Sequence, residues 1–270
     1  MSESTMKTGL VSITFREHSL EGLVVLVTDV GLSGVEWGGD VHAPHGDLAT
    51  ASRAKRLCEE SGLEISAYGS YYRFDDCLEE GVGDGPEFEA VLDTAEAMGA
   101  PSIRVWAGRR ASADVGEINF QRIVSRSREI GELASERGIR IDYEYHDNSL
   151  TDTHEATERL LDAVDHPNVR TLWQTPLQVG HAYRLEGITR LANRISNVHC
   201  NYFAENGWPD ALELSEGADE WGEYLQVLLD SAADRWISIE HVKAGSVEQF
   251  KRDVATLQRW LSRLSGRGEP

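Results

Sequence analysis

The segment Ile139-Arg140-Ile141-Asp142-Tyr143-Glu144 alternates between apolar and charged side chains along its whole length. In a β-strand this alternation places the apolar side chains on one face and the charged ones on the other. Gly138 stands directly before the segment and follows a helical run over 117–137, at the place where a left-handed glycine commonly ends a helix. The stretch therefore predicts a helix, a glycine turn and a strand in immediate succession.

The same succession repeats along the chain. The predicted strands span 10–16, 34–37, 63–68, 102–106, 139–144, 169–174, 195–199 and 236–240. The predicted helices span 19–31, 47–61, 87–98, 117–137, 153–165, 182–193, 218–233 and 246–264. Eight pairs give about 34 residues per pair, close to the length of one βαβ unit. We therefore predict a single α/β domain, a (β/α)₈ TIM barrel over 9–265, with tails over 1–8 and 266–270.

The alternation also predicts which way the strands face. Parallel strands covered on both faces are usually apolar throughout, whereas these strands carry a charged face. If the apolar face meets the helices, the charged face points to the barrel axis, where buried charges must pair. The expected network consists of Glu36, Glu64, Arg104, Arg140 and Arg170. The alternative, an α+β protein with one wet sheet face, would need hairpin turns between strands that helices separate here.

Composition and charge exclude several classes of protein. The 270 residues carry a formal net charge of −20, which disfavours contact with nucleic acid or an anionic membrane. No apolar run approaches the length of about 20 residues that spans a bilayer. The start of the chain, MSESTMKTG, is polar and unlike a signal peptide, and three scattered cysteines are typical of a reducing compartment. A cytoplasmic location is expected.

Polar side chains stand at the carboxyl ends of four later strands. Glu144, Gln174, His199 and Glu240 occupy the last inward positions there. Active sites of α/β barrels lie at this end, so the four side chains are expected to converge. Two carboxylates, an imidazole and an amide oxygen suit a divalent cation such as Mg²⁺, Mn²⁺, Co²⁺ or Zn²⁺.

Several segments resemble the xylose isomerase-like TIM-barrel superfamily of sugar isomerases and epimerases. They are VEWGGDVHAPHGD (35–47), SAYGSYYR (66–73), IDYEYH (141–146), TLWQTP (171–176), NVHCNYF (197–203), LSEGADEW (214–221) and ISIEHVKAGSVEQF (237–250). The resemblance implies one divalent cation held by Glu144, His199 and Glu240. Gln174 stands where the family usually has Asp, so the site carries less negative charge, and the His of the usual Asp-x-x-His pair is missing after it.

The chemistry that the resemblance implies is proton transfer beside a carbonyl. A bound metal acidifies the neighbouring C–H, and a carboxylate then removes the proton to give an enediolate. Glu144 and Glu240 are the expected acid–base pair. Return of the proton to the same carbon with inversion is epimerisation, and return to the neighbouring carbon is isomerisation.

Four other side chains are expected to bind substrate. They are His42 in the glycine-rich turn after strand 34–37, Trp106 as an apolar wall, His146 above Glu144, and Lys243 near a helix start. His241, next to Glu240, is expected to face a helix instead. The expected ligand is a small sugar or polyol-ketone, and barrels of this kind often assemble as a homodimer or homotetramer.

Three other functions compete with the isomerase or epimerase. An inosose-type dehydratase uses the same proton abstraction and then expels a β-hydroxyl. A non-catalytic carbohydrate-binding barrel would follow if Gln174 leaves the metal site degenerate. A phosphodiesterase resembling endonuclease IV shares the barrel but needs several zinc ions and a basic DNA-binding face, which the charge of −20 disfavours.

Overall fold

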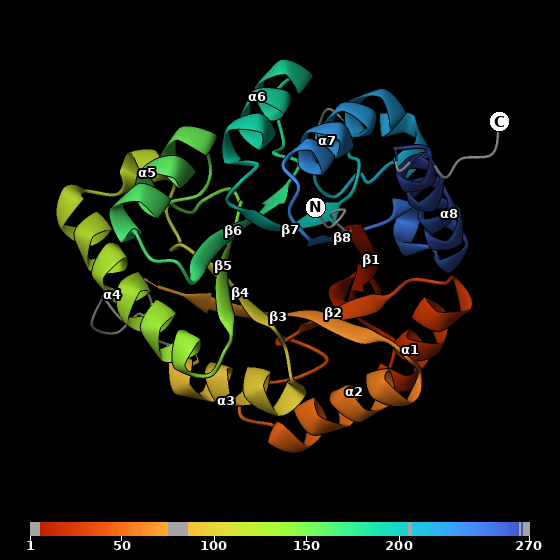
Figure 1. Cartoon of the computed structure of the whole chain (residues 1–270), viewed down its shortest axis with the longest axis horizontal. Coiled ribbons are helices and arrows are strands. Elements are labelled where there is room, and N and C mark those ends of the chain that lie inside the picture. Colours follow the sequence, from red (N-terminus) through yellow and green to blue (C-terminus); the bar gives the residue numbers. More distant parts are fainter. Residues whose placement is uncertain (1–5, 75–85, 205–206, 265, 267–270) are drawn as a thin grey trace.

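The computed structural model describes residues 6–74, 86–204, 207–264 and 266. In this part of the chain, eight strands form a closed barrel in chain order, and every neighbouring pair is parallel. Helices surround the barrel, one after each strand (Figure 1). The predicted single (β/α)₈ barrel is therefore confirmed.

The strands are short and follow one another around the barrel wall. They are β1 Met6–Val11, β2 Gly34–Gly38, β3 Glu64–Arg73, β4 Ser102–Trp106, β5 Arg140–Glu144, β6 Val169–Gln174, β7 Ile195–Cys200 and β8 Arg235–Ile239. Register shifts occur in the β2–β3, β3–β4 and β6–β7 pairs. The shift between Gly69 and Arg73 matters for the site, because it lets the end of β3 turn a side chain toward the barrel mouth.

The helices begin and end at residues whose local chemistry explains the boundaries. They are α1 Leu20–Asp29, α2 Leu48–Glu60, α3 Phe88–Met98, α4 Glu117–Glu136, α5 His154–Val164, α6 His181–Leu191, α7 Ala218–Asp230 and α8 Val247–Leu264. Asp47 caps α2 by accepting a hydrogen bond from the amide of Thr50. Gly99 ends α3 at φ 75°, the left-handed conformation that glycine adopts without strain.

The first strand differs from its prediction over 10–16. It runs over Met6–Val11, pairs with both β2 and β8, and gives way to the 3₁₀ turn η1 Ser12–Phe15. Ile13 and Phe15 are apolar side chains at alternate positions, as in a strand, but both are buried within the 3₁₀ turn. Residues 6–8 of the segment expected as a tail belong to β1, where Met6 pairs with Arg235. Residues 1–5, 265 and 267–270 lie outside the described residues.

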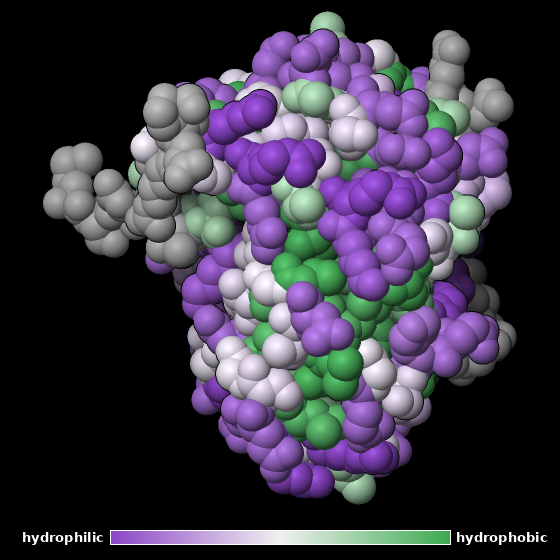
Figure 2. All heavy atoms as spheres, turned by 90° about the vertical axis from the view of Figure 1, so that its right-hand side faces the viewer, coloured by the Kyte–Doolittle hydropathy of each residue, from purple (hydrophilic) through white to green (hydrophobic). Residues whose placement is uncertain are grey.

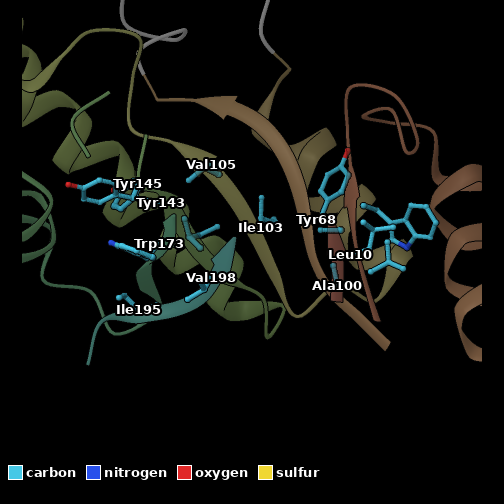
Figure 3. Close-up of a cluster of buried hydrophobic side chains, with 14 of the residues drawn as sticks. Leu10, Tyr68, Ala100, Ile103, Val105, Tyr143, Tyr145, Trp173, Ile195 and Val198 are labelled. Carbon is cyan, nitrogen blue, oxygen red and sulfur yellow. The ribbon is translucent and has the colours of Figure 1, made fainter. Parts of the chain in front are cut away.

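The two faces of the strands divide as the alternation predicts. Outward side chains such as Ile103, Val105 and Tyr143 fill the core between barrel and helices (Figure 3). Tyr143 reaches α4, where its hydroxyl donates to Ser127 Oγ. Trp173 packs edge-on against Tyr224 of α7, with ring centroids 5.4 Å apart. The charged side chains are left to face the axis.

The outer surface on the side of α1 and α8 carries an apolar area. Figure 2 looks at this side and shows hydrophobic side chains gathered in its middle, bordered by hydrophilic ones. Val25 of α1 is 58% exposed. Among the described residues, we find no helix with the length and apolarity that a membrane-spanning segment requires.

Candidate active site

A cavity of about 840 Å³ opens at the carboxyl ends of the strands. Six of the strands contribute a side chain from their last three residues or from the residue just beyond them. In order from β3 to β8, these are Tyr71, Trp106, Glu144, Gln174, Asn201 and Glu240. The expected convergence of strand-end side chains is therefore present, and the volume lies within the usual range for small-molecule sites.

Glu144, His199 and Glu240 form a buried cluster at the floor of this cavity. One potential ligand atom from each lies within 4.8 Å of the others. All three are at most 4% exposed. His199 Nδ1 lies 3.2 Å from Glu240 Oε2, yet it has no hydrogen-bond partner with suitable geometry. The cluster offers two carboxylates and one imidazole nitrogen to a single point.

A second layer of charge holds this cluster from below. Glu36 accepts a hydrogen bond from Arg104 Nε at 2.7 Å, and its other oxygen lies 2.9 Å from His199 Nε2. Arg104 Nη1 donates to Glu144 Oε2. The guanidinium is 1% exposed and lies against Gly69, where a Cβ would stand 2.5 Å from Nη2. A glycine at 69 is therefore required for the buried arginine to fit.

Of the predicted axial network, Glu36 and Arg104 meet. Glu64 pairs with Lys7, and Arg140 pairs with Asp142, both close to the opposite end of the barrel. Arg170 is exposed. The prediction was right for Glu36 and Arg104. It was wrong for the other three, because Glu64 and Arg170 are exposed and Arg140 is held by Asp142.

Mutual attraction fixes the charge states of the floor. Burial alone would lower the pKa of His199, but Glu240 and Glu36 on its two sides raise that pKa to about 10. Burial opposes ionisation of Glu240, yet the facing His199 holds the pKa of Glu240 well below its ordinary value. The pKa of Glu36 is lowered in the same way, by His199 and Arg104 against burial.

The donor set fits a divalent cation. Metal ligation requires a neutral imidazole, and then three carboxylates against the one guanidinium of Arg104 leave two negative charges. The unpartnered Nδ1 of His199 faces Glu240, while its other nitrogen is held by Glu36. A carboxylate that orients a ligating histidine through its second nitrogen is a common arrangement around protein-bound metals.

Gln174 contacts the floor through its amide nitrogen. Nε2 donates to Glu144 Oε1 at 3.2 Å and to the carbonyl of Tyr145 at 3.0 Å. Both partners are only acceptors, so the nitrogen and not the oxygen must face them. Gln174 therefore fixes the orientation of Glu144, a contact that an Asp at this position would replace with repulsion. Its predicted role as a metal ligand stays a prediction.

Trp106 and His146 form one wall of the cavity. Their rings stack with centroids 4.0 Å apart, and Trp106 Nε1 donates to Glu144 Oε2. His146 Nδ1 lies 2.7 Å from the carbonyl of Asp147, which can only accept, so Nδ1 carries the proton. In the neutral ring Nε2 then holds the lone pair. Both residues line the cavity as the sequence predicts.

His42 and Lys243 lie away from the cavity, against expectation. His42 is 6% exposed, and its ring nitrogens lie 3.0 Å from Ser12 Oγ and 3.2 Å from the carbonyl of His18. The turn after β2 closes on itself, since the amide of His42 donates to the carbonyl of Gly38, and the imidazole is thereby turned into the protein. Lys243 lies 3.4 Å from Glu213 and 3.7 Å from Glu216.

His241 and Tyr71 line the cavity because their backbones leave the strand conformation. His241 has φ 57°, so its side chain contacts Trp208 at the mouth, with ring centroids 4.6 Å apart, instead of facing a helix as predicted. Tyr71 has φ 55° within the irregular end of β3. Non-glycine residues with positive φ are uncommon, and the residue types at these two positions do not predict this conformation.

Arg16 is a further cavity residue that the sequence did not reveal. It follows η1, and its guanidinium pairs with Asp40 and lies 3.4 Å from the hydroxyl of Tyr71. The sequence predicted that Arg16 ends a strand over 10–16. In the structure β1 ends earlier, and the chain turns over the barrel mouth and brings Arg16 to the cavity.

Known proteins resemble this chain in sequence. A family model described as a xylose isomerase-like TIM barrel matches residues 24–264. A 3-dehydroshikimate dehydratase of Bacillus anthracis is 30% identical, over 93% of this chain and 96% of that protein.

Two solved structures show the same fold. A probable 3-DHS dehydratase of Bacillus anthracis has a TM-score of 0.77 at 23% identity, covering 94% of this chain and 99% of that chain. A 3-keto-D-glucoside 4-epimerase of E. coli has a TM-score of 0.70 at 15% identity, covering 94% and 99%. At these identities the structural likeness concerns the fold alone.

Proposed function

The chain belongs to the xylose isomerase-like TIM-barrel family, and from that premise we propose that it is a divalent-metal-dependent dehydratase of a cyclic hydroxy-keto acid, with 3-dehydroshikimate as the first substrate to test. The supporting observation is the 30% identity to a 3-dehydroshikimate dehydratase over nearly the whole of both chains. The cavity adds a buried carboxylate–imidazole cluster beside an aromatic wall, which suits a small oxygenated ring.

The proposed reaction begins with the proton transfer that the sequence predicts. The ring of 3-dehydroshikimate carries a ketone, a neighbouring C–H that also bears a hydroxyl, and a further hydroxyl on the next carbon. Removal of the proton beside the ketone gives an enediolate. The C–O bond at the next carbon then breaks, the hydroxyl leaves with a proton as water, and tautomerisation yields 3,4-dihydroxybenzoate.

Glu144, His199 and Glu240 would hold the cation. When bound, a divalent cation polarises the ketone and stabilises the negative charge of the enediolate. Gln174 and Arg104 keep Glu144 in place through the hydrogen bonds described above. The protein residues thus provide a pre-arranged, water-poor floor on which charge can develop at little cost of reorganisation.

His146 is the side chain that we assign to removal of the proton. Glu144 already accepts hydrogen bonds from Arg104, Trp106 and Gln174, which leaves it poorly placed to take up a proton. His146 lines the cavity, is oriented by its bond to the carbonyl of Asp147 and by stacking on Trp106, and keeps the lone pair of Nε2. The predicted pairing of Glu144 with Glu240 as acid and base is the alternative.

The decisive experiment is a turnover assay. The purified protein is stripped with a chelator, supplied separately with Mn²⁺, Mg²⁺, Co²⁺ or Zn²⁺, and incubated with 3-dehydroshikimate. We expect metal-dependent formation of 3,4-dihydroxybenzoate, measured by chromatography. Absence of product with every metal, from protein whose circular dichroism is that of a folded barrel, would overturn the proposal.

The isomerase or epimerase of the sequence-based prediction is the second candidate. It needs the same first proton transfer and the same floor, and it differs only in the fate of the enediolate. A screen of ketoses, aldoses and inososes in D₂O separates the two. Deuterium gained without loss of water indicates epimerisation or isomerisation, whereas loss of water from an inosose indicates a dehydratase of a different ring. Binding without exchange indicates a carbohydrate-binding barrel.

A further inference from the structure

We propose that Arg16 forms a carboxylate-binding subsite at the mouth of the cavity and so selects ring substrates that carry an acid group. The nature of the ring rests on the proposed function, whereas the subsite itself rests on the geometry around Arg16. Arg16 is the first residue after η1, lines the cavity, and has a side chain that is 44% exposed. A ligand entering the cavity therefore meets this guanidinium.

The cavity offers few cations to such a ligand. Among the described residues that line it, Arg16 and Arg104 are the arginines, and none is a lysine. Arg104 is 1% exposed and is already bound through Nε to Glu36 and through Nη1 to Glu144. Its Nη2 is enclosed next to Gly69. Of these two arginines, Arg16 is thus the one that remains accessible to an anionic group.

The contacts of Arg16 leave donors for a ligand. Nη1 pairs with Asp40, and Nη2 donates to Tyr71 Oη over a long distance of 3.4 Å. Hydrogen bonds of this kind are usually 2.7–3.2 Å long, so the contact with Tyr71 is readily exchanged for a stronger one. A carboxylate binds the planar fork of a guanidinium through two parallel bonds. Asp40 occupies Nη1, so an incoming carboxylate would bind through Nη2 and would gain the second bond by competing with Asp40.

Tyr71 sets the spacing between the subsite and the floor. Its ring lies 4.9 Å from the guanidinium carbon of Arg104, while its hydroxyl contacts Arg16. One phenol ring therefore separates the floor layer from Arg16. In 3-dehydroshikimate the carboxylate lies across the six-membered ring from the carbon that loses its proton. A ring lying alongside Tyr71 and Trp106 would present its reactive carbon to the floor and its carboxylate to Arg16.

A pair of ligands isolates the subsite from the chemistry. 3,4-Dihydroxybenzoate and catechol share the ring and both hydroxyls, and they differ in the carboxylate. Their dissociation constants are measured by titration calorimetry for the wild-type protein, Arg16→Gln, Arg16→Lys and Asp40→Asn, with Mg²⁺ present throughout. Both ligands can reach the floor in the same way, so their ratio of affinities reports on the carboxylate.

The wild-type protein is expected to prefer 3,4-dihydroxybenzoate. Arg16→Gln should weaken its binding roughly 10- to 100-fold, the range for losing charge-assisted hydrogen bonds, and leave catechol unchanged. Arg16→Lys should fall between, because it keeps the charge without the fork. Asp40→Asn should strengthen binding several-fold, because it frees the guanidinium from its internal partner.

Three outcomes overturn the subsite: equal affinity for both ligands in the wild-type protein, binding of neither ligand, or an equal loss for both in Arg16→Gln. The turnover assay separates this inference from the proposed function. Formation of 3,4-dihydroxybenzoate with an unchanged KM in Arg16→Gln removes the subsite alone. Preference for the carboxylated ring without turnover removes the proposed reaction alone.

Discussion

The two ends of the barrel carry the same kinds of charged residue in opposite environments. Beneath the carboxyl end, Arg104 and Glu36, at the middle of β4 and β2, have side chains that are 1% and 2% exposed. At the amino end, Lys7 and Glu64 form an ion pair with side chains that are 41% and 55% exposed. Exposed pairs contribute little to stability, whereas buried charges are tolerated only when every partner is present. The difference shows where the chain keeps charge at a cost, and this is where we place its chemistry.

The largest effect is expected when a carboxylate is neutralised at the buried end. Glu240→Gln removes one of the three groups that we propose hold the cation, and it should abolish metal-dependent turnover and solvent-deuterium exchange. Glu64→Gln, at the exposed end, is the matched control and should behave as wild type. The measurement is deuterium incorporation followed by mass spectrometry, with bound metal determined in parallel. Exchange that persists in Glu240→Gln would remove Glu240 from the site.

The next effect concerns the proton acceptor. His146→Asn keeps a polar side chain without the basic nitrogen, and it should lower kcat by about 10²–10⁴-fold, the usual contribution of general acid–base catalysis. Metal content should stay unchanged, because His146 is not among the residues that we propose hold the cation. If His146→Asn retains wild-type kcat, the proton goes to a carboxylate, as the sequence-based pairing of Glu144 with Glu240 predicts.

Removal of the buried Arg104 guanidinium tests whether the buried and the exposed charge clusters contribute differently to the free energy of unfolding. Arg104→Met leaves Glu36 and Glu144 without their cation, and unfolding in urea should show a loss of about 3–5 kcal/mol, as for other broken buried pairs. Glu64→Gln again serves as the control, with an expected change below about 1 kcal/mol. Equal losses at both ends would mean that burial does not distinguish the two charge clusters.

Whether the sequence predicts the direction of a side chain in the site depends on whether the backbone there keeps a regular strand conformation. Alternation placed Glu36, Arg104 and Glu144 on the axis, since side chains on a strand point alternately to its two faces. The same alternation placed the apolar side chains of these strands against the helices. Both predictions concern residues inside strands, where the direction of each side chain follows from its position in the chain.

The failures lie where the strands end. Arg16 and His42 follow short turns, and Tyr71 and His241 have positive φ, so position in the chain no longer gives direction. These conformations depend on contacts from distant elements, such as the bond from the amide of His241 to Thr14 Oγ1. The positions of the floor residues, of Trp106 and of His146 therefore followed from the sequence, whereas those of Arg16, Tyr71 and His241 did not.

Gln174 offers a smaller test, inside the buried end. Gln174→Asp adds a charge and loses the donor to Glu144 Oε1 and the carbonyl of Tyr145. Metal affinity should rise about tenfold, corresponding to roughly 1.4 kcal/mol of added attraction. Stability without metal should fall by about 1–3 kcal/mol, because buried acceptors lose their donor. Gln174→Asn shortens the side chain without adding charge and should lower stability without raising metal affinity. An equal metal affinity in both variants would separate Gln174 from the metal site.

The smallest effect is expected from salt, and it distinguishes the two ends most directly. Salt screens exposed charges over about 10 Å at 0.1 M, but it reaches buried pairs much less. The chain carries a net charge of −20, so added salt should stabilise the wild-type protein by reducing repulsion at its surface.

The two variants should respond differently to salt. The small loss of unfolding free energy caused by Glu64→Gln should vanish as salt is raised, while the loss caused by Arg104→Met should persist. Urea unfolding at several concentrations of NaCl measures both. If the Arg104→Met loss fades with salt as well, solvent ions reach the floor of the barrel, and the buried pairs are not the closed cluster that the structure describes.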